Sequence, residues 1–323
     1  ALFQSTFSRQ IQDLRGQLDR ASLEMLTGRR ADVSKATRGN NQTLLQAQAA
    51  IDAAEPERAR IAVLEGRYRT AGLALETIRN LSENAALTAQ GAGDLAAGVD
   101  ADRFAATEAK AALAAVFSTF EARFGGRSLF GGDLGSGRVL ADVTAFLAEV
   151  DTAVGGATSA ADVTAAIDSV LAPGGAFETS IYLGGDPAAE AELADGSRLG
   201  EIFTAASDNM RQLYKGLAMA AFNGSVDLDE RSAFLQDSAE IVLTANEDMV
   251  AEEASIGISL LAIERERDRQ DQLLFQAELT MDTVLGRDPF EAASETQSLE
   301  AKLQAAYTVT GRIGSLRLTN FLR

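Results

Sequence analysis

Apolar residues recur at helical spacing over most of the chain, and the first segment carries a clear example. Six positions there follow one another at intervals of four and three residues: Phe7, Ile11, Leu14, Leu18, Ala21 and Met25. This spacing places them on one face of a helix, as in the seam between two packed helices. Gly28 follows at once and suits the left-handed conformation that often ends a helix. We therefore predict a first helix that ends near residue 27, followed by a polar loop over residues 34–42.

The same periodicity continues for longer stretches in the rest of the chain. Eight consecutive seam positions run through one segment: Ile61, Leu64, Tyr68, Ala71, Leu75, Ile78, Ser82 and Ala85. They predict a helix over residues 51–91, with Pro56 marking a break or a helix start. Further helices are predicted over residues 101–124, 199–221 and 229–285. A last helix is predicted from residue 292, with its seam at Leu299, Leu303, Ala306, Thr310 and Ile313. Both terminal seams need a partner, because an isolated helix is marginal in water.

The middle of the chain is built differently, since residues 125–198 hold 13 of the 28 glycines. Glycine pairs there predict turns between short apolar runs at 138–140 and 177–183, and short helices are predicted at Val143–Val154 and Ala160–Leu171. The fold class is therefore mainly α: a long antiparallel helical bundle or coiled coil formed by both chain ends, with a small glycine-rich α+β outer domain inserted between them. We expect that insert to have a hydrophobic core of its own.

The pattern divides the chain into three parts. Residues 1–40 and 290–323 are predicted to be terminal coiled-coil assembly segments. Residues 41–130 and 199–289 are predicted to form a helical rod domain, and residues 131–198 the outer α+β insert.

Composition and charge exclude several function classes. The chain has no Cys and no His, which removes disulfides, thiolate metal sites and the usual general base near neutral pH. The net charge is −18, yet residues 301–323 carry four basic residues and no acidic one. We expect neither a nucleic acid nor a membrane as partner, because the body of the chain is acidic and no apolar run reaches membrane-spanning length. The first residues lack the features of a cleavable secretory signal.

Several segments could bind phosphate, a metal ion or nucleic acid, but each is better explained as an ordinary structural feature. Residues 131–137 are rich in glycine but lack the lysine of a phosphate-binding loop, so we predict a turn. The acidic pairs Glu247–Asp248 and Glu252–Glu253, and the acids between 264 and 268, lie among arginines, as on a solvated helix face. Asp227–Glu230 lacks a full calcium loop. The basic residues of 9–38 have no interleaved aromatics for stacking on bases. No catalytic, cofactor-binding or metal-binding residue is predicted, and no cofactor.

Several short motifs, in order, resemble the flagellin superfamily. They are Thr27–Arg30 at the end of the first helix, Leu75–Leu81 in the second, Arg127–Gly132 before the insert, Tyr182–Asp186 and Ala194–Ser197 within it, and Leu303–Leu322 at the end. The last three are similar to the branch of hook-associated proteins at the hook–filament junction. The chain departs from the family at Ala31–Thr37, where an acidic Asp-Asp-Pro-like loop is usual.

The resemblance implies a structural subunit of the bacterial flagellum and not an enzyme. It implies polymerisation through terminal coiled-coil helices at the hook–filament junction. The implied partners are copies of the chain, neighbouring axial proteins (hook-associated proteins and flagellin) and a flagellar export chaperone in the cytoplasm. The implied location is extracellular, after type III export without a cleavable signal. The assembly interface is then expected at Phe7, Ile11, Leu14, Leu18, Met25, Leu299, Leu303, Ala306, Ile313, Leu316 and Phe321.

Other functions remain open from the sequence. Filament flagellin itself shares the class and the core helices. A secreted coiled-coil protein that does not polymerise has the same helical pattern. A helical-bundle enzyme that uses carboxylates or a Ser/Lys pair is disfavoured, because no polar cluster converges and His is absent.

Overall fold

The computed structural model describes residues 2–33, 41–94 and 98–321. Its regular elements are almost all helices, and the strands named in the described part form one two-stranded sheet. The prediction of a mainly α fold is confirmed. The chain divides into two compact units, one made of Ala1–Arg58 and Arg269–Arg323, the other of Ala59–Asp268. We call them the terminal unit and the central unit.

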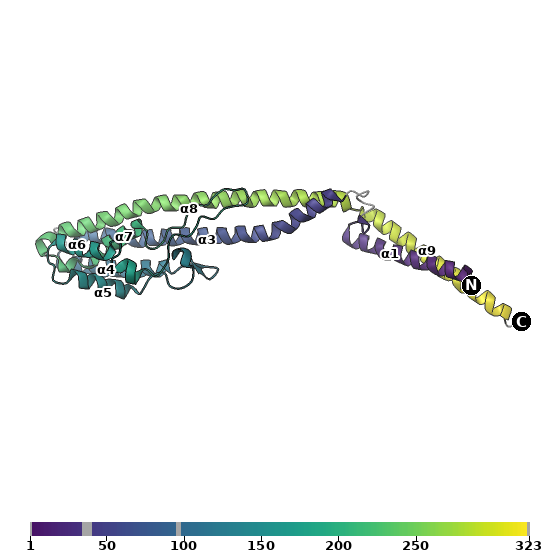
Figure 1. Cartoon of the computed structure of the whole chain (residues 1–323), viewed down its shortest axis with the longest axis horizontal. Helices are drawn as coiled ribbons and strands as arrows, with labels where there is room; N and C mark the ends of the chain where they lie inside the picture. Colours follow the sequence, from purple (N-terminus) through teal and green to yellow (C-terminus); the bar gives the residue numbers. More distant parts are fainter. Residues whose placement is uncertain (1, 34–40, 95–97, 322–323) are drawn as a thin grey trace. The chain divides into compact units, whose positions relative to one another are not determined.

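In the terminal unit, helices α1 (Leu2–Thr27) and α9 (Pro289–Phe321) lie side by side and antiparallel (Figure 1). Helix α1 ends as predicted, because Gly28 adopts the left-handed conformation with φ 65°. Helix α9 begins earlier than residue 292. The Asp288 side chain accepts a hydrogen bond of 2.7 Å from the Phe290 N–H and so caps the helix, and Pro289 occupies its first position.

The terminal unit also contains the start of α3 (Gln42–Ala92) and the end of α8 (Leu228–Leu285). These segments share a small buried cluster of Ala47, Ala277, Met281 and Leu285. The prediction that Pro56 marks a break or a helix start is wrong, because α3 begins at Gln42 and continues through Pro56. The proline removes one donor from the helix, and the turns on either side keep it continuous.

In the central unit, the α3 seam predicted between residues 61 and 85 is buried at all eight positions. It packs along α8, which runs beside it (Figure 1). Polar contacts also join these two helices. The Ser82 hydroxyl bonds to the Asn246 side-chain oxygen at 2.8 Å in a fully buried place, and Arg79 pairs with Glu253 at 3.0 Å.

Helix α4 (Val99–Phe120) ends before the predicted residue 124, because the chain turns there into a short hairpin. Its strands β1 (Arg123–Phe124) and β2 (Arg127–Ser128) pair Arg123 with Ser128. Gly125 and Gly126 supply the positive φ angles that such a two-residue turn requires. The Phe124 ring lies against α3 at Gly66, where a Cβ atom would come within 2.1 Å of the ring.

The insert contains the two predicted short helices with the predicted bounds, α5 (Val143–Val154) and α6 (Ala160–Leu171). Each begins at a side-chain cap: Asp142 accepts from the Thr144 N–H at 2.9 Å, and Ser159 from the Asp162 N–H at 3.1 Å. The expected strands are reduced to an isolated bridge between Leu140 and Tyr182. The second apolar run forms a single π-helical turn, η2 (Phe177–Ile181), and a short 3-10 turn, η1 (Gly132–Leu134), opens the insert.

The expectation that the insert has a core of its own is wrong. Phe146 on α5 packs against Phe117 on α4 with ring centres 5.5 Å apart. Phe146 and Phe177 both contact Tyr214 on α7 (Asp208–Ala221), at 6.2 and 5.2 Å. One continuous set of buried side chains therefore joins the insert to the helices that flank it.

The helix predicted over residues 199–221 begins only at Asp208. The preceding stretch is irregular because its backbone groups bond to the long helices. The Gly200 carbonyl accepts from the Tyr68 hydroxyl at 2.5 Å, and the Gly200 N–H donates to the Ser259 hydroxyl at 3.0 Å. A short 3-10 turn, η3 (Asn223–Ser225), then joins α7 to α8.

Candidate assembly interface

The residues expected to form the assembly interface lie on α1 and α9, and their burial differs along the pair. Leu299 is buried, whereas Met25 is 41% exposed. The half-buried members are Ile11, Leu14, Leu18, Leu303 and Ala306. The side chains of Phe7, Ile313, Leu316 and Phe321 lie outside the described part. Much of the predicted seam thus faces the partner helix of the same chain, and its half-buried side chains keep some surface uncovered.

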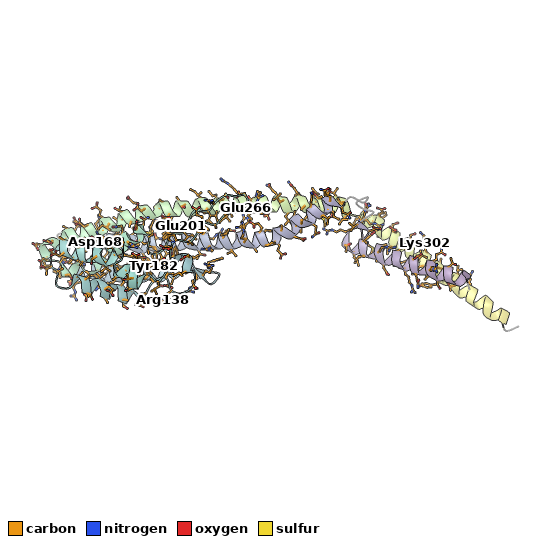
Figure 2. All side chains as sticks on the ribbon, in the orientation of Figure 1. Arg138, Asp168, Tyr182, Glu201, Glu266 and Lys302 are labelled. Atoms are coloured by element: carbon orange, nitrogen blue, oxygen red, sulfur yellow. The ribbon has the colours of Figure 1, made fainter. Side chains whose placement is uncertain are left out.

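A polar contact joins the two helices midway along the pair. The Arg15 Nε donates a hydrogen bond of 2.6 Å to the Tyr307 hydroxyl, and its guanidinium lies 5.5 Å from the centre of the Tyr307 ring. Both groups are exposed, so this contact adds modestly to the pairing. Lys302 lies nearby in sequence on α9, and Figure 2 labels it there.

Two backbone hydrogen bonds close the other end of the pair. The Arg30 N–H donates to the Leu285 carbonyl at 2.7 Å, and the Arg287 N–H donates to the Gly28 carbonyl at 3.0 Å. They form an antiparallel bridge in which Arg29 faces Gly286. The bridge ties the chain just after α1 to the link between α8 and α9.

A cluster of three charged side chains lies next to this bridge: Glu24 and Arg287, which are nearly buried, and the half-exposed Glu295. We call these three residues the clasp. Arg287 forms ion pairs with Glu24 and with Glu295. The other Glu24 oxygen accepts a hydrogen bond of 2.8 Å from the Ala31 N–H. The side chains of Glu24 and Arg287 are each 11% exposed, so their charges are largely removed from water. Each is compensated by the other, as buried charges require.

A polar cleft of about 640 Å³ opens beside the clasp. Besides the clasp residues, its walls carry Gln17, Arg20, Arg30, Asp32 and Glu291. Its lining contains charged side chains of both signs.

Sequence reasoning did not find the clasp. It predicted the helix end at Thr27–Arg30 and the gap between the helices that end at residue 285 and begin at residue 292, and these two segments meet at the clasp. Nothing local connects Glu24 to a residue so distant in the chain. A carboxylate next to the seam of a terminal helix is the one signal that could have raised the question of its partner.

The terminal unit exposes many large apolar side chains outside its own seam. Leu26 on α1 is 80% exposed, Phe290 on α9 84% and Phe275 on α8 65%. Others in the same unit are Leu23, Leu45, Leu273, Leu279 and Val309. Isolated exposed apolar residues are ordinary, but this density on a unit with a small buried cluster is typical of a surface that contacts a partner.

The glycine-rich segment and the acidic residues that the sequence offered as chemical sites make contacts within the fold. Residues 131–137 include a 3-10 turn, and the Asp133 N–H donates to the Asp186 carbonyl at 2.8 Å. Glu253 pairs with Arg79, and Glu230 accepts from the Ala160 N–H at 2.7 Å. Among the described residues, no group of three acidic side chains is placed to hold a metal ion. Within the same residues, no helix has an apolar stretch that could cross a bilayer.

Glu252 is a carboxylate of the central unit whose pKa is raised. Burial raises the pKa of Glu252 above its ordinary value of 4.5, and the nearby Glu201 adds to the shift. Figure 2 labels Glu201 in the irregular stretch before α7, and Glu252 lies on α8. Both belong to the packing of that stretch against α8, where the Ser259 hydroxyl accepts a hydrogen bond from the Gly200 N–H.

Comparison with known proteins gives a likeness of fold. No protein-family model matches the sequence, and no curated protein matches it. Among solved structures, the crystal structure of Bacillus cereus FlgL is similar with a TM-score of 0.54 and 13% identity, over 74% of this chain and 100% of that chain. A structure from Vibrio parahaemolyticus, described as that of a flagellar hook-associated protein, has a TM-score of 0.46 and 14% identity, over 75% of this chain and 93% of that one. The first of these likenesses shows that the chain has the fold of a FlgL-type protein.

Proposed function

We propose that the chain is a structural subunit of the bacterial flagellum that polymerises through its terminal helices at the hook–filament junction. The exposed apolar side chains of the terminal helices carry this proposal, because leaving Leu23, Leu26 and Phe290 in water does not stabilise a monomer. The likeness of fold to Bacillus cereus FlgL supports it and gives the kind of assembly to expect.

In this proposal, residues 1–40 and 290–323 are the assembly segments, residues 41–130 and 199–289 the rod, and residues 131–198 the outer insert. The expected seam on α1 makes two contacts, one within the chain and one with a neighbouring copy. Ile11, Leu14 and Leu18 pack on α9 of the same chain, and the surface they leave uncovered meets a neighbouring copy. Repetition of one such contact between unlike surfaces builds a helical polymer.

The proposed partners are further copies of the chain and the neighbouring axial proteins, namely hook-associated proteins and flagellin. A flagellar export chaperone is the proposed partner in the cytoplasm, and the extracellular flagellum the proposed location. The proposed role needs no catalysis and no cofactor.

The seam can be tested with a single charge. Leu14→Asp places a carboxylate on the half-buried face of α1, which costs several kcal/mol if a neighbour buries it. We expect loss of polymer in sedimentation velocity, with the monomer's circular dichroism largely kept. Gln12→Asp is the matched control, because it adds the same charge at an exposed position of the same turn. Normal polymer from Leu14→Asp would mean that the seam is not an assembly surface.

Filament flagellin is the alternative within the same class, and polymer length separates the two. A filament protein forms long fibres alone, whereas a junction protein forms short assemblies or requires an axial partner. A secreted helical protein that does not polymerise remains monomeric at every concentration.

A further inference from the structure

The buried side chains of the α1–α9 pair gather near the C-terminal end of α1. Among the described side chains of the two helices, the buried ones are Ala21 and Glu24 on α1 and Ala292, Thr296 and Leu299 on α9. All lie within about two turns of the clasp. Farther along, Ile11, Leu14 and Leu303 are only half-buried. The packing that holds α1 therefore weakens with distance from its C-terminal end.

The clasp adds directional bonds at that tight end. Glu24 uses one oxygen for Arg287 and the other for the Ala31 N–H. The backbone N–H of the same Arg287 donates to the Gly28 carbonyl. Arg287 therefore binds the C-terminal end of α1 through both its side chain and its main chain. Removing the Glu24 charge leaves Arg287 with only the half-exposed Glu295 as its partner, and removing Arg287 leaves Glu24 without a counter-charge. Either loss is more costly than losing an exposed pair.

We propose that the clasp is a conformational lock that fastens α1 most firmly at its C-terminal end. With the lock closed, α1 opens from its N-terminal end, turn by turn. With the lock broken, α1 leaves as one body and the central unit stays folded. The lock belongs to the single chain and does not depend on polymerisation, so its failure and the failure of the proposed function are separate results.

Hydrogen exchange followed by mass spectrometry tests the lock on the full chain at concentrations where it is monomeric. In the wild type, amides of residues 19–27 should exchange more slowly than those of residues 6–18. Glu24→Gln keeps the shape and an acceptor for the Ala31 N–H but removes the charge. We expect it to speed exchange of residues 19–27 on the order of 100-fold, and to abolish the gradient along α1. Peptides of α4 should be unchanged, which shows that the central unit remains folded.

Three further variants make the result decisive. Glu300→Gln removes an exposed charge from α9 and should change no peptide of α1 by more than about twofold. Arg287→Gln and the double variant Glu24→Gln/Arg287→Gln complete a cycle in which the double variant should exchange more slowly than the sum of the two single effects predicts. If Glu24→Gln fails to fold, Glu295→Gln takes its place, with an expected increase of about tenfold in residues 19–27. Additive effects, or exchange in α1 that matches the Glu300→Gln control, would overturn the lock.

Discussion

The shared core of the insert predicts that one buried ring supports helices on both sides of it. Phe146 on α5 has no exposed surface, and it contacts the rings of Phe117, Phe177 and Tyr214 at 5.5, 6.1 and 6.2 Å. Truncation of a buried Phe to Ala costs about 3–5 kcal/mol through lost transfer energy and the remaining cavity. That measured range already includes lost contacts between rings. Because Phe146 has three ring neighbours, Phe146→Ala should fall at the upper end of the range, about 4–5 kcal/mol of unfolding free energy.

Urea unfolding followed by circular dichroism measures that loss, and Leu147→Ala is the matched control on the same helix. Leu147 is only partly buried, so its truncation should cost about 1–2 kcal/mol. Hydrogen exchange then locates the effect. Because Phe117 lies on α4, peptides of α4 should lose protection together with those of α5 in Phe146→Ala. Replacing residues 134–197 by a short linker should destabilise α4 in the same way.

Two results would refute this reasoning. One is a cost for Phe146→Ala no larger than that for Leu147→Ala. The other is a loss of protection confined to residues 131–198, with α4 unchanged. The second result would mean that the insert folds on a core of its own after all.

Further single changes test other parts of the fold. Gly66→Ala should detach the β1–β2 hairpin from α3, because its Cβ would lie 2.1 Å from the Phe124 ring; faster exchange at residues 123–128 would report it. Since the pKa of Glu252 is raised in the folded chain, its contribution to stability is present below pH 4.5 and is lost as the pH rises through the folded-state value. Glu252→Gln should therefore stabilise the protein at pH 7 and flatten the rise in unfolding free energy toward pH 4.5, measured by urea titrations across that range. Gly286→Ala should lower the melting temperature, because its Cβ would meet a carbonyl at 2.2 Å.

Local signals predicted the parts of the fold that local physics determines. Helix α5 has the predicted bounds because its apolar spacing agrees with a capping Asp142 and a terminal Gly155. Helix α1 ends where Gly28 permits a left-handed residue. In both places helix propensity, capping and periodicity favour the same structure, so a single sequence is enough to predict where the helix ends.

The errors occurred where distant residues decide the conformation. Leu199, Ile202 and Phe203 fit a helical pattern, yet Gly200 bonds to Tyr68 and Ser259 and the stretch stays irregular. The insert's core includes side chains from α4 and α7, which no glycine pattern could reveal. The clasp likewise depends on a pairing of Glu24 with Arg287 that periodicity does not encode.

Polymerisation through the terminal helices is the central claim, and electron microscopy of the purified full chain tests it most directly. The chain is imaged at rising protein concentration, alone and with an added axial flagellar protein. The account predicts helical assemblies that are short for the chain alone and that extend or attach when the axial protein is present. Particles that remain single at every concentration, with and without the axial protein, would contradict it.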